Sequence, residues 1–449
     1  MSTMTKKDNI VRRLGRGLTV SMDKYLPDAF IFALILSGIV FLLGLFVAKK
    51  SPYEMVTFWY GGFWNFLAFS MQMALIVITG HCLATTKLVG GWLDSIASKA
   101  TNPKKAITIV VLVSFIAAWI NWGFGLVIGA LIAKKISSTQ KGVDFPLMVA
   151  AAYTGAISAM FGLSLTAPLL VNTPGHFLES SIGLIPVTET IFSPQVLIIN
   201  VVVLALLLVV FRLMIPTKKE EIFELNIKDD PNDGEELTDK PKTIAEKLEQ
   251  SSIISYIVGI AGVFIVVNHF MKNGLDLNID IVNFLFLILG VILHKNPINY
   301  VKAVSEAVKS VYGVILQFPF YAGIMGMMAS SGLVAIFANW IVSFTTPTSY
   351  PFLTFLQVGI VNFFVPSAGG QWMIQGPILT TAGEALGVAA KTSVIAYSFG
   401  DLSTNLIQPF WALPVLGIAN LKIKDIWGYC FVGFLVFFVV CSIGLTVLS

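Results

Sequence analysis

The residues best suited to binding chemistry lie in two short polar segments, about 245 positions apart. Each segment interrupts an apolar hairpin and combines glycine with a tryptophan and with neutral polar side chains. Glycine allows a ligand to approach the backbone closely, and amide or hydroxyl groups can bind a small anion or Na⁺. The predicted substrate contacts are Asn121, Trp122 and Gly123 in the first segment, and Ser367, Ala368, Gly369, Gly370, Gln371 and Trp372 in the second.

Each polar segment is followed by an apolar stretch that breaks in its own middle, at residues 158–166 and again at 400–405. Asp401 is the only carboxylate that falls deep within a predicted span, and an ionisable residue there is a functional candidate. It can bind a coupling cation, take up a proton, or merely cap a half-helix. The predicted coupling residues are Asp401, Ser403, Ser158, Ser164 and Thr166, and Thr404 and Asn405 are predicted to line the substrate site.

Taken singly, each polar residue is better explained by a local cap or an interhelical hydrogen bond, and each tryptophan can be an interfacial anchor instead of a cavity wall. The matched set in two halves instead favours a binding site at a repeat interface of a secondary transporter. No Lys or Arg falls at midplane depth in the predicted topology. A small monoanion held by backbone amides and helix dipoles therefore fits better than a highly charged substrate.

Membrane spans are the elements that must position these residues. The chain has 449 residues, of which 56% are hydrophobic and 12% charged, and several apolar runs reach the roughly 20 residues that cross a bilayer. The three cysteines form no metal or disulfide pattern, so no cofactor is expected. Spans are predicted at 28–48, 64–86, 144–172, 194–214, 253–271, 279–294, 312–330, 391–418 and 427–448, and re-entrant hairpins at 106–140 and 351–386.

The distribution of basic residues sets the orientation. This path places 25 of the 29 Lys and Arg residues on one side, which the positive-inside rule identifies as the cytoplasm. The N-terminus is then cytoplasmic and the C-terminus periplasmic or extracellular. Because the basic residues are distributed according to the membrane topology, they give no indication of nucleic-acid binding. The lipid bilayer is the expected partner.

Matching landmarks suggest an inverted repeat in an all-α polytopic membrane protein. Tyr153 corresponds to Tyr397 and Pro168 to Pro414 at nearly constant offset. One additional membrane span between the halves gives them opposite orientations. The first hairpin is therefore expected to enter from the cytoplasm and the second from outside. The expected units are the first repeat at 1–216, a charged cytoplasmic linker at 217–249, a connecting span at 250–278 and the second repeat at 279–449.

Three motifs, NWGFGLVIGA at 121–130, VPSAGGQWMIQGP at 365–377 and SFGDLSTNLIQPFW at 398–411, resemble the bacterial short-chain fatty acid transporter family over nearly the whole chain. The resemblance implies membership of the ion transporter superfamily, an elevator-type mechanism, a possible homodimer, and uptake of butyrate, acetoacetate or similar monocarboxylates. The paired Ser-Asn-Thr tips of sodium-coupled dicarboxylate members are absent here, which favours H⁺ over Na⁺ as the coupling ion.

The predicted function is secondary active import of short-chain fatty acid anions across the inner membrane of a bacterial cell. A dicarboxylate or amino-acid carrier of the same superfamily is the alternative, and it would require additional fixed cationic donors. A membrane enzyme such as an acyltransferase is disfavoured because no His and acid pair falls at membrane depth. A passive channel would not concentrate its substrate, so uptake above equilibrium separates it from a carrier.

Overall fold

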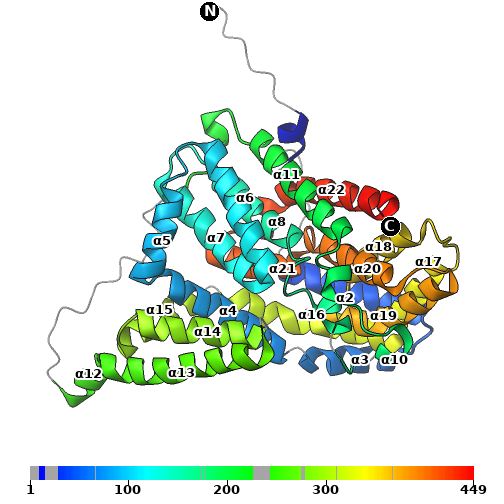
Figure 1. The fold of residues 1–449 in the computed structure, drawn as a ribbon, viewed down its shortest axis with the longest axis horizontal. Helices are drawn as coiled ribbons and strands as arrows, with labels where there is room; N and C mark the ends of the chain where they lie inside the picture. The colour runs from blue at the N-terminus through cyan, green and yellow to red at the C-terminus, as the bar shows by residue number, and fades with distance from the viewer. Residues whose placement is uncertain are drawn as a thin grey trace, which may run out of the picture.

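The computed structural model describes residues 10–15, 29–65, 67–172, 174–176, 178–225, 243–274, 279–309, 311–366 and 368–448. Within these residues the secondary structure is helical, with no strand (Figure 1). The first half contains α2 (Ala29–Phe46), α3 (Pro52–Asn65), α4 (Leu67–Ala84), α5 (Lys87–Ala97), α6 (Pro103–Ile120), α7 (Trp122–Thr139), α8 (Phe145–Ser158), α9 (Thr166–Val171), α10 (Glu179–Ile182) and α11 (Pro194–Leu213).

The second half repeats this pattern of long and short helices after a connecting segment. The Ser367 position, a predicted substrate contact, lies outside the described residues. The helices are α12 (Ile244–Glu249), α13 (Ser252–Asn273), α14 (Ile279–Leu293), α15 (Pro297–Val308), α16 (Tyr312–Ser331), α17 (Leu333–Val342), α18 (Tyr350–Asn362), α19 (Ala368–Ala385), α20 (Ala390–Asn405), α21 (Pro409–Ala419) and α22 (Ile423–Val447).

Helix starts follow local sequence signals. Asn102 accepts a hydrogen bond from the Lys105 amide at 3.0 Å and precedes Pro103, the first residue of α6. Ser193 caps α11 in the same way, directly before Pro194. A capping side chain satisfies an amide that the helix leaves unpaired, and proline at the first position loses no intrahelical bond.

Several helices are long and apolar enough to cross a membrane. Among the described residues, four segments qualify singly, namely Pro103–Ile120, Pro194–Leu213, Ile244–Asn273 and Ile423–Val447, and α20 with α21 qualifies as a pair bent by 49°. The bend agrees with the predicted broken span near the C-terminus. Helix α6 reaches spanning length by itself, although the sequence predicts it as one limb of a re-entrant hairpin.

Four shorter helices were not predicted as elements, and they occur in corresponding places of the two halves. Helices α3 and α15 each begin at a proline after a turn, and α5 and α17 each follow a predicted span. With 14 residues or fewer, these helices are too short to cross a hydrocarbon core, so a search for spans overlooks them.

The second broken helix departs from the sequence prediction. The expected break at residues 400–405 is helical, because α20 continues to Asn405, and the interruption lies at residues 406–408. Pro409 explains its position, since proline disfavours a helical conformation in the residue before it. Gly400 serves packing instead, because a Cβ there would lie 2.6 Å from the Phe355 carbonyl oxygen of α18.

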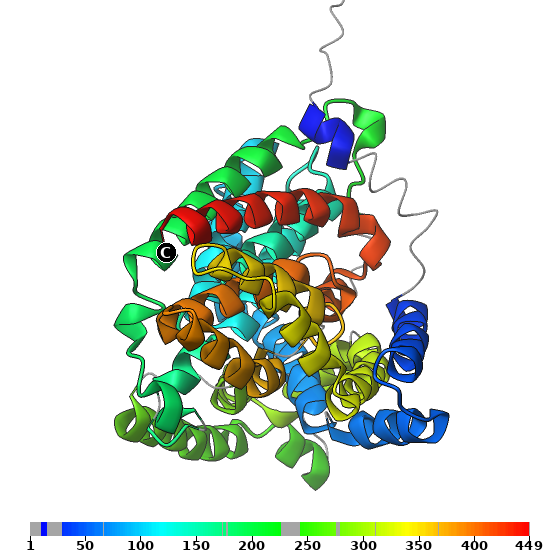
Figure 2. The same ribbon diagram turned by 90° about the vertical axis from the view of Figure 1, so that its right-hand side faces the viewer.

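The helices pack in two groups. In one, α16 packs against α2 and α3, and α4 packs against α14 and α15, with α13 on α14. In the other, α6, α7 and α8 pack together, α22 packs against α8 and α11, and α18 packs against α20. Figures 1 and 2 show α13 to α15 toward the bottom and α11 and α22 toward the top.

The start of the predicted linker is attached to the group that contains α6, α7 and α8. The Phe223 amide donates to Asp144 Oδ1 at 2.9 Å, and the Phe145 amide donates to the Phe223 carbonyl at 2.9 Å. The Glu224 carboxylate accepts a hydrogen bond from the Gly142 amide at 2.6 Å. Residues 222–225 therefore cover the connection between α7 and α8, and residues 226–242 lie outside the described part of the chain.

Candidate functional site

A cavity of about 100 Å³ lies where the polar segments of the two halves meet. It is formed by the start of α7, the break between α8 and α9, the start of α19, the end of α20 and the start of α21. Seven of the predicted site residues line it. The lining residues are Trp122, Met160, Ser164, Leu165, Thr166, Ala368, Gly369, Asp401, Leu402, Asn405 and Trp411.

In the first half, the loop at residues 159–165 is attached to the turn between α6 and α7. The Trp122 amide donates to Ser164 Oγ at 3.0 Å, and the Leu163 amide donates to the Trp119 carbonyl at 2.8 Å. A Cβ at Gly162 would collide with the same carbonyl, so glycine is required for this close approach. Hydrogen bonds thus hold Ser164 at the first turn of α7.

In the second half, α19 begins at the cavity. Ala368 and Gly369 line it with the first turn of this 18-residue helix, where unpaired amides and the helix dipole favour an anion. The Tyr397 hydroxyl donates to the Ala368 carbonyl at 2.6 Å and anchors this turn on α20. A Cβ at Gly369 would lie 3.3 Å from Thr166 Cγ2, so the two halves touch at this point.

Among the described residues, Asp401 is the only acidic one in the cavity wall, and it is 2% exposed. Its Oδ2 atom accepts a long hydrogen bond of 3.5 Å from Asn405 Nδ2. Its Oδ1 atom has no hydrogen-bond partner among the described residues. No Lys, Arg or His from the described part of the chain lines the cavity. An ionised Asp401 would therefore be a buried charge without a counter-charge, which is unfavourable unless a proton or cation binds.

Asn362, at the end of α18, holds the end of α20 that carries Asp401 and was missed by the sequence prediction. Its Nδ2 atom lies 2.7 Å from the Asp401 carbonyl oxygen, 2.7 Å from Asn405 Oδ1 and 3.0 Å from Thr404 Oγ1. The side chain is fully buried. An amide in the apolar limb just before a predicted tip was the available signal, because buried polar groups require partners.

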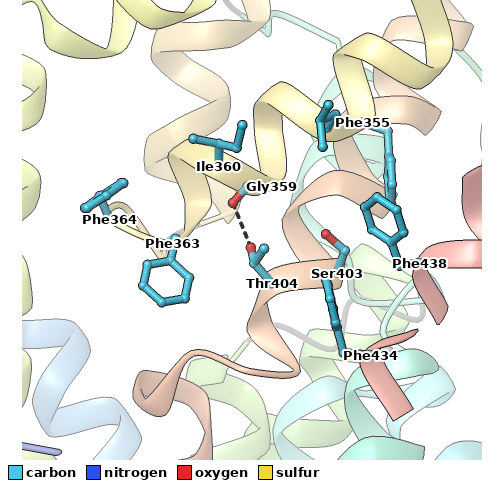
Figure 3. A pocket seen from close by; sticks show the side chains of 10 residues that line it. Phe355, Gly359, Ile360, Phe363, Phe364, Ser403, Thr404, Phe434 and Phe438 are labelled. Carbon is cyan, nitrogen blue, oxygen red and sulfur yellow. Dashed lines mark hydrogen bonds between the residues drawn. The ribbon is translucent and has the colours of Figure 1, made fainter. Parts of the chain in front are cut away.

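Two of the predicted residues face a different cavity on the other side of α20. Ser403 and Thr404 line an almost wholly apolar space of about 300 Å³ together with aromatic side chains of α18 and α22 (Figure 3). The Thr404 hydroxyl donates to the Gly359 carbonyl at 2.9 Å, and that of Ser403 donates to Gly400 in its own helix at 2.8 Å. Both hydroxyl groups therefore donate hydrogen bonds to backbone carbonyls of neighbouring helical turns.

Trp372, a predicted substrate contact, is not among the residues that line the cavity. It is fully buried and packs against Tyr397 with ring centroids 4.7 Å apart. Trp411 takes the expected place instead, because its ring lies 5.2 Å from that of Trp122 at an angle of 81°. Gln371 is turned inward as well, and its Nε2 atom donates to the Val358 carbonyl at 3.0 Å.

The other predicted residues have local roles near the cavity. Asn121 caps α7 by accepting a hydrogen bond from the Phe124 amide at 3.0 Å. A Cβ at Gly123 would lie 2.4 Å from Ile76 Cδ1, so Gly123 lies against the Ile76 side chain of α4. Ser158 is fully buried at the end of α8, and neither Ser158 nor Gly370 is among the lining residues.

Comparison with known proteins agrees with the family suggested by the motifs. The sequence model of the family described as "Short chain fatty acid transporter" matches residues 10–448. Two curated relatives carry the name "Putative short-chain fatty acid transporter". The relative from Escherichia coli is 39% identical over 439 residues, covering 97% of this chain and 100% of the relative. The relative from Haemophilus influenzae is 40% identical over 430 residues, covering 94% and 96%.

One solved structure aligns with the chain over most of its length. The crystal structure of the Alcanivorax borkumensis YdaH transporter aligns with 93% of this chain and 98% of its own. The sequence identity is 16% and the TM-score is 0.44.

Proposed function

This chain belongs to the short-chain fatty acid transporter family, and we propose that it imports butyrate, acetoacetate or a similar short monocarboxylate by secondary active transport across the inner membrane. The observation that carries the proposal is the small cavity where the halves meet, which combines a helix N-terminus with a lone buried carboxyl group. Secondary transporters bind their substrates at such repeat interfaces, near interrupted helices.

The carboxylate of the substrate binds at the start of α19. The first turn of that helix offers amides at Ala368 and Gly369 together with the positive end of the helix dipole. Thr166 and Asn405 add a hydroxyl and an amide from the opposite walls. No cationic side chain from the described residues lines the cavity, which suits a monoanion better than a dicarboxylate.

Asp401 couples this binding to a proton. A bound carboxylate would place a second negative charge in the same enclosed space, and two adjacent buried carboxylates favour a shared proton. The proton resides on the Asp401 side chain or on the substrate, and it enters the cavity with the anion. Na⁺ coupling is the competing possibility, since an ionised Asp401 and nearby oxygen atoms can also attract a cation.

The transport cycle that we propose uses an inverted repeat with two re-entrant hairpins, formed by α6 with α7 and by α18 with α19. The hairpins, α8, α9 and α20 move as an elevator, and α11 and α22 move with them because they pack against α8. Helices α2 to α4 and α13 to α16 form the scaffold of a possible homodimer. The N-terminus is cytoplasmic, as the basic residues indicate.

Uptake of radiolabelled butyrate into proteoliposomes tests the proposal. We expect accumulation above equilibrium when the outside is more acidic, and none when only a sodium gradient is imposed. Protein-free vesicles at the same pH supply the correction for passive entry of the neutral acid. Accumulation driven by sodium alone would refute proton coupling. Inhibition and transport by succinate or an amino acid, without transport of butyrate, would replace the proposal with the alternative carrier, and mere equilibration would indicate a channel.

A further inference from the structure

The cavity has a polar part and an apolar part, and of the apolar part only Trp122 was predicted from the sequence. Five apolar side chains line it, namely Trp122, Met160, Leu165, Leu402 and Trp411. We infer that Met160 and Leu165, closed off by Trp411, set the upper limit on the length of the substrate's alkyl chain. This inference rests on the proposed transport of short monocarboxylates.

The loop that carries Met160 and Leu165 is held in place on several sides. The Phe161 carbonyl accepts a hydrogen bond of 3.1 Å from Asn200 Nδ2 of α11. The Phe161 ring packs against Phe399 of α20, with centroids 4.7 Å apart. Together with the bonds to the turn between α6 and α7, these contacts restrict the loop. A rigid wall discriminates by size, because it cannot move aside without breaking its own contacts.

Trp411 closes the same space from the second half. It follows Phe410, whose ring stacks on Phe318 of α16 with centroids 4.1 Å apart, and whose amide is capped by Gln408 at 2.9 Å. Trp411 is only 8% exposed, and its edge-to-face contact with Trp122 joins the two halves. The tryptophan pair is thus anchored at the start of α21 and at the start of α7.

The size of the cavity agrees with a short substrate. Its volume of about 100 Å³ is well below the roughly 300–1,000 Å³ of pockets for drug-sized ligands. Because the polar groups must contact the carboxylate, the remaining space admits only a few methylene groups. Met160 is 4% exposed and Leu165 is 6% exposed, so their side chains fill the space that a longer chain would need.

Met160→Ala is the direct test, and the measurement is the ratio of hexanoate to butyrate uptake in proteoliposomes. We expect the ratio to rise about fourfold for each methylene group that the enlarged cavity admits, from the free energy of burying one methylene. Met160→Leu conserves the volume and should keep the wild-type ratio. Met148→Ala removes a fully buried methionine of α8 that does not line the cavity, so it should leave the ratio unchanged even if it lowers the melting temperature.

The outcomes separate this inference from the proposed function. Wild-type protein that fails to transport any of the acids would overturn the proposed function itself. An unchanged ratio in Met160→Ala, with butyrate uptake retained, would overturn the inference alone. If Met160→Ala does not fold, as judged by thermal unfolding, Leu165→Ala takes its place with the same expected direction. An equal rise in Met148→Ala would show that the effect comes from general loosening, and would also overturn the inference.

Discussion

In the first half of the molecule the break between α8 and α9 spans residues 159–165, whereas in the second half the break between α20 and α21 spans only 406–408. The longer break forms much of the cavity wall and is bonded to the neighbouring hairpin turn. The shorter break leaves α20 helical past Asp401 and Asn405, so its side chains reach the cavity from a continuous helix. The first break thus contributes residues of a loop to the cavity, whereas the second half contributes side chains of a continuous helix.

The first turns of α7 and α19 also differ in how their backbone groups are bonded. At the start of α7, the Trp122 and Phe124 amides are bonded to Ser164 and to Asn121, respectively. At the start of α19, Ala368 and Gly369 line the cavity, and Tyr397 secures the turn through a carbonyl rather than an amide. In the function that we propose, the first half therefore contributes mainly to the shape of the cavity, and the second half supplies most of the groups that attract an anion and its proton.

A change at Asp401 should have the largest effect, because no other acidic side chain from the described part of the chain lines the cavity. We expect Asp401→Asn to abolish butyrate accumulation driven by a pH gradient. Asparagine has nearly the same shape and resembles a protonated carboxyl group, so exchange of internal for external butyrate should persist. The measurement is concentrative uptake and counterflow in the same proteoliposomes.

The control is Glu189→Gln, which neutralises an exposed carboxylate paired with Lys391 at 3.1 Å, away from the cavity. It should leave both concentrative uptake and exchange unchanged. Wild-type accumulation of butyrate by the Asp401→Asn variant would show that Asp401 does not couple transport to protons. The second half would then lack the coupling group that we assign to it.

Asn362 and Asn200 allow the two halves to be compared by the same substitution. The Asn362 side-chain nitrogen lies within hydrogen-bonding distance of three oxygen atoms of α20 near Asp401, whereas the Asn200 side-chain nitrogen donates a hydrogen bond to the Phe161 carbonyl. Each buried group left unsatisfied costs about 1–3 kcal/mol. Asn362→Ala should therefore lower the melting temperature in detergent more than Asn200→Ala, and it should also reduce butyrate uptake more strongly. A larger loss in Asn200→Ala would reverse the assigned roles of the halves.

Much of the cavity could be predicted because polar residues in apolar stretches are conspicuous. Trp122, Ser164, Thr166, Asp401 and Asn405 stand out against their surroundings, and the structure brings them to one place. The physical basis is general, since a polar group at membrane depth requires either a partner or a water-filled cavity. The family could be recognised for a related reason, because these segments also carry the distinctive motifs.

The apolar wall could not be predicted in this way. Met160, Leu165 and Leu402 lie in apolar runs, where nothing in the sequence separates a cavity residue from a packing residue. The sequence predicted Trp372 as a substrate contact, whereas Trp411 lines the cavity, and the cause is similar. Both tryptophans lie in the second half near the polar segments, so the sequence does not distinguish them. Which of the two faces the cavity depends on the rotation of each helix about its axis, and tertiary packing determines that rotation.

The smallest expected effect concerns Ser164, whose hydroxyl caps the start of α7 from the neighbouring loop. Ser164→Ala leaves the Trp122 amide without this partner, and loss of a capping side chain costs typically about 1 kcal/mol. We expect a slightly lower melting temperature and weaker butyrate uptake with the coupling to protons intact, because Asp401 is untouched. Ser398→Ala is the matched control, since that buried hydroxyl donates to the Val394 carbonyl within α20 at 2.8 Å. If both variants behave alike, the bond between the loop and α7 does not hold the cavity wall. A loss of proton coupling in Ser164→Ala would mean that the first half contributes to the chemistry and not only to the shape.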